Sequence, residues 1–221
     1  MPVHTLPEDI LAEYASGATS PGVSLLVAAH LTHAPEGRQV VREYERLGGV
    51  MLKDEKPEEL SATALDDVFS RIDALAPAKE VEAHDAVSEP QPRSGDCPLP
   101  APVLERLGVS FDDIAWKFRL PGVSAYDFDG FGDETVQLLR AKPGVSIPQH
   151  THRGVEMTLV LQGCLEDGGI AYRRGDVAIN DEEDDHRPRV LGDEVCYCLI
   201  VQRGDLHFTG PFSRILNFLG E

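Results

Sequence analysis

Two histidines stand two positions apart in the middle of this chain, and a glutamate follows four residues after the second. His150 and His152 flank a single threonine, and Glu156 comes next. Residues two apart on a β-strand point to the same face, so both imidazoles can reach one ion. Glu156 adds an anionic oxygen donor. Histidine pairs also arise by chance on exposed strands, so the pattern favours a metal site but needs support from the surrounding sequence.

That support comes from the residues after Phe111, where short apolar runs alternate with turn signals such as Pro121-Gly122 and Pro143-Gly144. Many short strands separated by glycine-rich turns are typical of a β-sandwich or barrel. We therefore expect strands over residues 114–120, 135–140, 157–161, 169–172, 176–179, 195–201 and 206–209.

The first 76 residues have a helical pattern instead. Thr5-Leu6-Pro7-Glu8 has the form of a capping box with Thr5 as N-cap, and Ser20-Pro21 predicts the start of a second helix. Apolar residues at helical spacing predict two more helices, over about 36–52 and 62–75. The plain interpretation of these stripes is a common four-helix core.

Residues 77–99 contain many prolines and serines and few apolar side chains, which is typical of a linker. The expected organisation is a helical domain over 1–76, a linker over 77–99 and a β domain over 100–221. The fold class is thus α+β and multidomain, with a small N-terminal helical bundle followed by an all-β barrel.

The spacing around the two histidines matches the first cupin motif throughout: glycine, five residues, HxH, three residues, glutamate, six residues, glycine, from Gly144 to Gly163. Gly175 and His186 keep the spacing of the second cupin motif. That second motif is degraded, because its usual proline, glycine and asparagine positions hold Asp181, Glu183 and Val190.

The resemblance implies a cupin barrel in which His186 supplies a third imidazole. The expected metal ligands are therefore His150, His152, Glu156 and His186. Such a donor set suits a divalent transition metal, with zinc first and iron, manganese or nickel as alternatives.

The formal net charge of −18 argues against free nucleic acid as a partner, because an acidic surface repels phosphates. A basic protein, or one that itself binds nucleic acid, fits better; the acidity could equally serve solubility alone.

Neither a signal peptide nor a bilayer-spanning stretch is evident, so we expect a cytoplasmic protein without a membrane partner. Four cysteines do not form a disulfide framework; Cys196 and Cys198 lie on one strand face, roughly 7 Å apart and too far for an easy bridge.

Both halves together resemble the ChrR-type anti-sigma factors. The resemblance is carried by "IPQHTHRGVEMTLVLQG", by "GDVAI" and "CYC", and by "PEDILAEYASG" and "LLVAAHLTH" in the helical half. It implies that the helical half binds an extracytoplasmic-function (ECF) sigma factor, and that the cupin half senses an oxidative-stress signal at its metal. Residues 1–76 hold 13 Asp plus Glu against 6 Lys plus Arg, a net of −7, which is compatible with covering a basic sigma factor.

One departure from that family concerns a second zinc site. Members carry H-x3-C-x2-C on the second helix, and an earlier histidine completes the site. Here His30 keeps the histidine position and His4 could be the earlier one, but Ala34 and Gly37 replace the two cysteines. We therefore expect no tight zinc site in the N-terminal domain.

Two other functions remain open on the sequence alone. The chain could be a metal-dependent cupin enzyme, a dioxygenase or isomerase acting on a small molecule, although the separate helical half argues against an enzyme. It could also be a cupin that only binds or stores a ligand.

Cys196 and Cys198 are either oxidisable sensor thiols or plain buried strand residues. A homodimer formed through the cupin is a further possibility.

Overall fold

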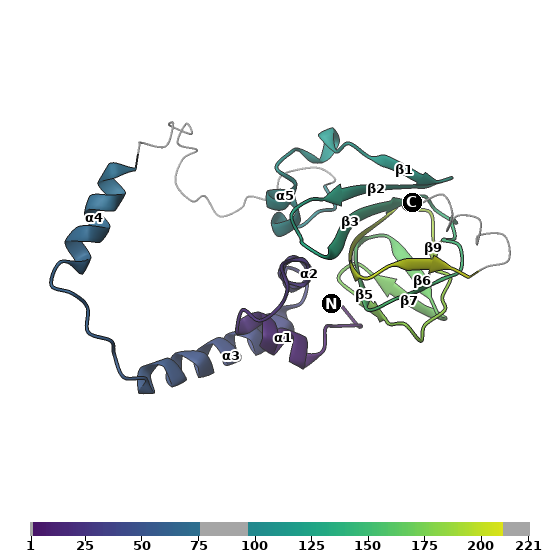
Figure 1. The fold of residues 1–221 in the computed structure, drawn as a ribbon. Helices are drawn as coiled ribbons and strands as arrows, with labels where there is room; N and C mark the ends of the chain where they lie inside the picture. The colour runs from purple at the N-terminus through teal and green to yellow at the C-terminus, as the bar shows by residue number, and fades with distance from the viewer. Residues whose placement is uncertain (1, 76–96, 210–221) are drawn as a thin grey trace. The chain divides into compact units, whose positions relative to one another are not determined.

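The computed structural model describes residues 2–75 and 97–209 (Figure 1). Two compact units divide the chain: residues 1–48 together with 97–221, and residues 49–96. The expected boundary within residues 77–99 falls largely outside the described residues, so the division at 76 and 100 stays a prediction. None of the helices in the described ranges combines the length and hydropathy that a bilayer-spanning segment needs.

The helices begin close to where their sequences predict, with one correction at the N-terminus. Pro7, and not Thr5, is the N-cap of the first helix, and no side chain caps it. Tertiary hydrogen bonds explain the difference: the Val3 and His4 N–H groups donate to the Asp176 carboxylate at 2.6 and 2.9 Å. The described helices are α1 (Glu8–Ala15), α2 (Pro21–Leu31), α3 (Pro35–Asp54), α4 (Ala64–Ala74) and α5 (Ala101–Leu107), with a 3-10 turn η1 (Phe111–Asp113).

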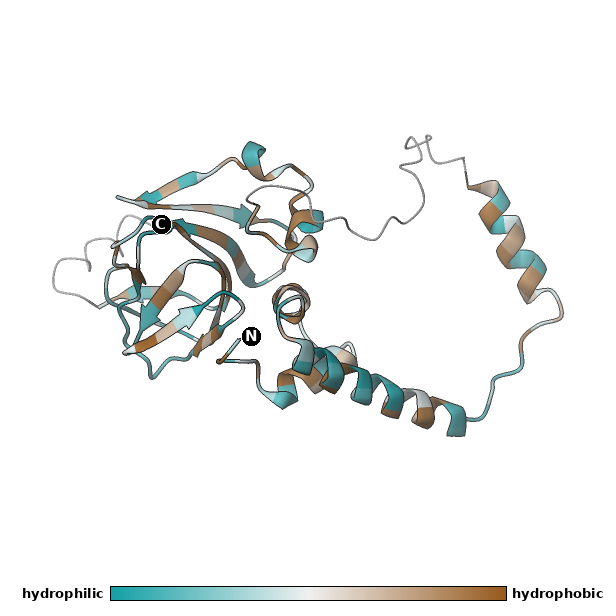
Figure 2. Cartoon of the chain, turned by 180° about the vertical axis from the view of Figure 1, so that it is seen from behind, coloured by the Kyte–Doolittle hydropathy of each residue, from teal (hydrophilic) through white to brown (hydrophobic). Residues whose placement is uncertain are grey.

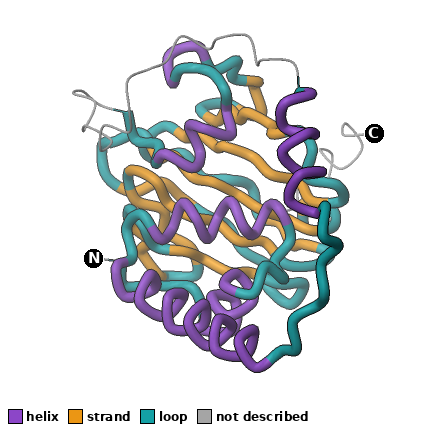
Figure 3. Tube along the Cα trace, turned by 90° about the vertical axis from the view of Figure 1, so that its left-hand side faces the viewer, coloured by secondary structure: helices purple, strands orange, loops and turns teal. Residues whose placement is uncertain are grey.

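Helix α2 is apolar almost all round and is accordingly buried against the β part of its unit. Its N-terminus meets Glu134 of strand β3, which accepts hydrogen bonds from the Gly22 N–H at 2.9 Å and the Ser20 hydroxyl at 2.5 Å. A Cβ at Gly22 would lie 2.9 Å from Val136 and 3.0 Å from Val201, so only glycine lets the helix approach the sheet this closely. In Figure 3 the strands of the large sheet lie side by side behind this helix.

Helix α4 belongs to the second unit, so the expectation of a common four-helix core stays a prediction. None of its residues is buried, and its apolar side chains are 50% to 71% exposed from Val68 to Leu75. Hydrophobic and hydrophilic residues share this helix in Figure 2. The helical spacing of its apolar residues was predicted correctly, but the spacing does not say what covers them.

The β part consists of a six-stranded sheet in the order β1-β2-β3-β10-β5-β8, a three-stranded sheet β7-β6-β9 and a two-stranded sheet β11-β4. All strand pairs are antiparallel. The predicted fold class, helices followed by an all-β domain, is confirmed. The strands are β1 (Lys117–Leu120), β2 (Val123–Phe128), β3 (Glu134–Ala141), β4 (His150–His152), β5 (Glu156–Gln162), β6 (Cys164–Asp167), β7 (Ile170–Arg173), β8 (Val177–Asn180), β9 (Arg189–Leu191), β10 (Cys196–Arg203) and β11 (Leu206–Phe208).

The large sheet separates two hydrophobic clusters, because successive side chains of a strand point to opposite faces. On β10, Leu199 and Val201 belong to the cluster that includes Leu26 of α2. Cys196 and Cys198 belong to the second cluster. The first cluster joins the helices to the sheet, and the second lies among the β-strands around the histidines.

Candidate metal centre

Strand β4 presents His150 and His152 on one face, as their spacing predicts, and both are buried while Thr151 between them is half-buried. His186 lies opposite His150 in an isolated antiparallel bridge, in which each backbone N–H donates to the other residue's carbonyl at 3.0 Å. Glu156 is the first residue of β5. The fold thus brings histidines 34 residues apart in sequence into direct contact.

The three imidazoles form a compact buried cluster. One ring nitrogen from each of His150, His152 and His186 lies within 4.8 Å of the others, and each side chain is less than a tenth exposed. Glu156 adjoins this cluster, with its Oε2 atom 3.6 Å from Nε2 of His152, and is itself buried. The three histidines form a group that could hold a metal ion, and Glu156 as the fourth ligand stays a prediction.

Hydrogen bonds fix which nitrogen two of the histidines present to the centre. Nδ1 of His150 lies 2.8 Å from the Pro148 carbonyl, and Nδ1 of His186 lies 2.6 Å from the Asp167 carboxylate. Both partners can only accept, so each Nδ1 carries the proton and each Nε2 keeps its lone pair. A carboxylate behind a metal-binding histidine holds the ring's orientation and raises its basicity. Asp167 is a buried residue of β6 that the sequence analysis did not identify.

His152 shows why a cation suits this place. Its Nε2 lies 2.9 Å from Nε2 of His186, and its buried Nδ1 has no hydrogen-bond partner. Without an ion, a neutral His152 can donate an Nε2–H hydrogen bond to the lone pair of His186, and a metal ion would take the place of that proton. Three imidazole nitrogens beside a carboxylate are a donor set for a divalent transition metal, so the residues present fit such an ion.

The ionisation of these groups favours metal binding as well. Burial, helped by the charge of neighbouring imidazoles, lowers the pKa of His150 and of His152 to about 4. Burial alone would also lower the pKa of His186, but the hydrogen bond and charge of Asp167 outweigh it and raise the value. Burial raises the pKa of Glu156. His150 and His152 are thus neutral and ready to act as ligands at neutral pH.

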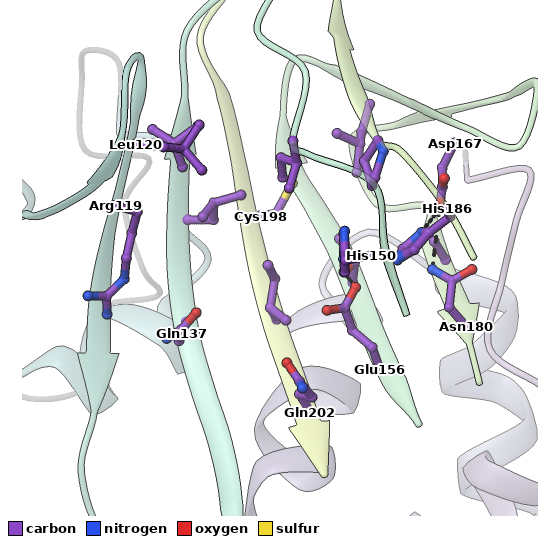
Figure 4. A pocket seen from close by; sticks show the side chains of 18 of the residues that line it. Arg119, Leu120, Gln137, His150, Glu156, Asp167, Asn180, His186, Cys198 and Gln202 are labelled. Atoms are coloured by element: carbon purple, nitrogen blue, oxygen red, sulfur yellow. Dashed lines mark hydrogen bonds and ion pairs between the residues drawn. The ribbon is translucent and has the colours of Figure 1, made fainter. Parts of the chain in front are cut away.

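A cavity of about 130 Å³ opens beside the histidines (Figure 4). His150, Glu156 and His186 line one end of it, and Cys198 lines its wall. Any ion held by the histidines therefore faces a space that admits a small molecule.

Cys196 and Cys198 share one face of β10, with their sulfur atoms 3.6 Å apart and both thiols free. The hydrogen bond from Cys196, together with burial, raises the pKa of Cys198 well above its ordinary value. A protonated, buried thiol is a poor nucleophile. The pair therefore packs as apolar residues at neutral pH, and its role in sensing stays a hypothesis.

The N-terminal histidines are arranged differently. Nδ1 of His30 is engaged by the Gly175 carbonyl at 2.9 Å, and the His4 ring packs against Tyr172 at 5.0 Å. Ala34 is buried, and a Cβ at Gly37 would lie only 3.0 Å from the Leu31 side chain. Apolar packing thus fills the positions where the family carries cysteines; the absence of a zinc site there stays a prediction.

Comparison with known proteins places these features in one family. The model of the ChrR cupin-like domain matches residues 104–206. The anti-sigma-E factor ChrR of Cereibacter sphaeroides is 30% identical over 220 residues, which cover 96% of this chain and 98% of that protein. The crystal structure of Rhodobacter sphaeroides SigE in complex with the anti-sigma ChrR matches 90% of this chain and 98% of the other with a TM-score of 0.74 and 29% identity. The likeness covers the helices as well as the cupin-like β part, and the chain belongs to the ChrR family of anti-sigma factors.

Proposed function

We propose that this protein is an anti-sigma factor that sequesters an ECF sigma factor and releases it when a metal-binding cupin domain senses an oxidative-stress signal. The main support for binding of a sigma factor is how much of this chain resembles ChrR. ChrR, whose complex with SigE is known, is similar over 96% of this chain, so the likeness includes the helical segment as well as the cupin.

The exposed face of helix α4 supports a protein partner. Leu65, Val68, Phe69, Ile72 and Leu75 follow the spacing of one helical face, and each is at least half exposed. Amphipathic helices commonly lay such a face into the hydrophobic groove of a partner. Burying each of these side chains in a complex contributes about 1.5–3 kcal/mol, so together they can carry a stable association.

A pull-down of the tagged full-length protein from its native host, with mass spectrometry of the bound proteins, tests this half. An ECF sigma factor recovered in near-equal amount supports the proposal, and its absence under unstressed conditions contradicts it. The double variant Phe69→Asp, Ile72→Asp removes two apolar contacts and should weaken the complex by about a hundredfold or more. Ser70→Asp adds a charge on the opposite side of the same helix and is the matched control.

The histidine cluster supports the sensing half. It is buried, it has the donor set of a metal site, and it faces a cavity that small molecules can enter. A metal bound there would supply a position at which an oxygen-containing molecule from the cavity could coordinate, and loss of an oxidised ligand would release the metal. The ligands in this proposal are His150, His152, Glu156 and His186, with zinc as the first candidate.

Replacing His150 or Glu156 by alanine tests the sensing half. The variants should bind less metal, as measured by elemental analysis, and should hold the sigma factor even when the cell is stressed. Exposed Glu183→Ala, in the acidic loop before His186, is the control. If the His150 variant still releases the sigma factor normally, the cupin metal is not the sensor. Metal-dependent turnover of an oxidisable small molecule by the wild-type protein would instead favour a cupin enzyme.

A further inference from the structure

The cavity inside the cupin domain is larger than a metal and its water require. Its volume is about 130 Å³. An apolar cavity of about 150 Å³ in another protein binds benzene, whereas a single water needs only about 10–15 Å³. The space therefore admits a ligand of roughly six to eight non-hydrogen atoms.

The order of the strands gives this cavity two different ends. Arg119 belongs to β1 at one edge of the six-stranded sheet, and Glu156 belongs to β5 near the other edge. Figure 4 shows Arg119 and Gln137 at one end and His150, Glu156 and His186 at the other. The histidine end is the candidate metal centre, and the arginine end has not been assigned a role.

The wall between the two ends is mainly apolar. Strands β3 and β10 lie between β2 and β5 in the sheet, and they contribute Leu139, Cys198 and Ile200 to the lining. Leu139 pairs directly with Cys198 across the two strands. This wall suits a hydrocarbon chain, since burial of apolar surface from both partners stabilises the complex.

The arginine end carries a net positive charge. Arg119 and Lys117 both form ion pairs with Asp127, the latter at 2.9 Å, and Gln137 donates to the same carboxylate at 2.8 Å. Burial alone would raise the pKa of Asp127, but Arg119 and Lys117 outweigh it and keep the carboxyl ionised. Two cations against one anion leave a charge of +1 in a protein whose formal net charge is −18.

Arg119 can serve a ligand in addition to Asp127. Its guanidinium has five N–H donors in a planar fork, and the ion pair with Asp127 involves Nη2. Its side chain is 35% exposed, so an anion from solvent can reach it. A carboxylate matches the geometry of this fork, because its two oxygens can accept two parallel N–H bonds.

We propose that this cavity binds a small organic anion, a carboxylate with an apolar chain of about four to six carbons, whose carboxylate pairs with Arg119 and whose chain lies against Leu139 and Ile200. The far end of the chain then points toward the histidine cluster. This inference rests on the proposed function for its biological meaning, because it names the class of molecule that would reach the sensing site.

Isothermal titration calorimetry of the full-length protein, as purified and without sigma factor, tests the proposal. Pentanoate, 1-pentanol and pentylammonium share one chain length and differ in charge. Pentanoate should bind at one site, and both other probes should bind at least about tenfold more weakly because neither offers Arg119 an anionic acceptor with two oxygens. No binding of pentanoate, or equal binding of all three probes, would overturn the proposal.

Variants locate the binding. Arg119→Gln should weaken pentanoate binding at least about tenfold, whereas Arg203→Gln, the same charge change at an exposed position of β10, should stay within about twofold of wild type. Ile200→Trp fills the cavity and should abolish binding while the thermal unfolding transition is retained; undiminished binding in a folded Ile200→Trp protein places the ligand elsewhere. Sigma factor binding is measured separately by the pull-down, so failure of one proposal is distinguishable from failure of the other.

Discussion

The carboxylate of Glu134 is the contact on which the docking of helix α2 depends most clearly. It is buried, and it accepts hydrogen bonds from the Gly22 N–H and the Ser20 hydroxyl at the positive end of that helix. Glutamine at this position keeps one acceptor and places an NH₂ group against the other donor. The loss of one hydrogen bond to a charged group costs about 1.5–3 kcal/mol, and the loss of the charge at the helix N-terminus about 0.3–1 kcal/mol.

We therefore expect Glu134→Gln to lower the free energy of unfolding by about 2–4 kcal/mol. Urea unfolding followed by the fluorescence of Trp116 measures it, since this is the single tryptophan and it packs against the core beneath α2. With a slope of about 2–3 kcal/mol per molar urea, the midpoint should fall by about 1 M.

Asp133→Asn is the matched control for this variant. It makes the same charge change one residue earlier, where the side chain is 80% exposed and its ion pair with Arg203 is long at 3.7 Å. The control should change the free energy of unfolding by less than about 0.5 kcal/mol. Equal effects of the two variants would refute the reasoning, because the effect would then come from charge alone and not from the helix contact.

Three further outcomes follow from the histidines and the thiols. Asp167→Asn should weaken zinc binding about 10–100-fold in a chelator competition, because the carboxylate orients His186; an unchanged affinity would contradict that role. Burial lowers the pKa of His30, so the folded state binds fewer protons than the unfolded state below pH 6.5. The free energy of unfolding should therefore fall as the pH drops from 7 to 5, and fall less steeply in His30→Gln; equal slopes in the two proteins would contradict this account. Alkylation followed by mass spectrometry should label exposed Cys97 at least about a hundredfold faster than buried Cys198, and equal rates would show that β10 opens readily.

The sequence predicts the histidine cluster well because most of its information is local. His150 and His152 share a face whenever residues 150–152 form a strand, and Glu156 follows at the start of the next strand. His186 required the spacing of a known motif, since nothing in the residues between says which strand returns to β4.

The parts that the sequence did not predict depend on contacts between distant residues. Asp167 reaches His186 only because β6 and the loop before β9 lie together, and no local pattern marks it. Glu134 and Asp176 bond to residues more than 100 positions away. The apolar stripe of α4 has the spacing of any amphipathic helix, so the sequence alone does not say whether a helical core or a partner covers it.

Strand β10 contributes side chains both to the cavity beside the histidines and to the core beneath helix α2. Its even-numbered residues from Cys198 to Gln202 line the cavity, while Leu199 and Val201 belong to the core under helix α2. Neighbouring side chains on one strand are joined by a single rigid peptide plane, so a displacement of one face cannot be absorbed by a loop before it reaches the other. A residue of β10 that lines the cavity is therefore flanked along the strand by residues that pack beneath helix α2.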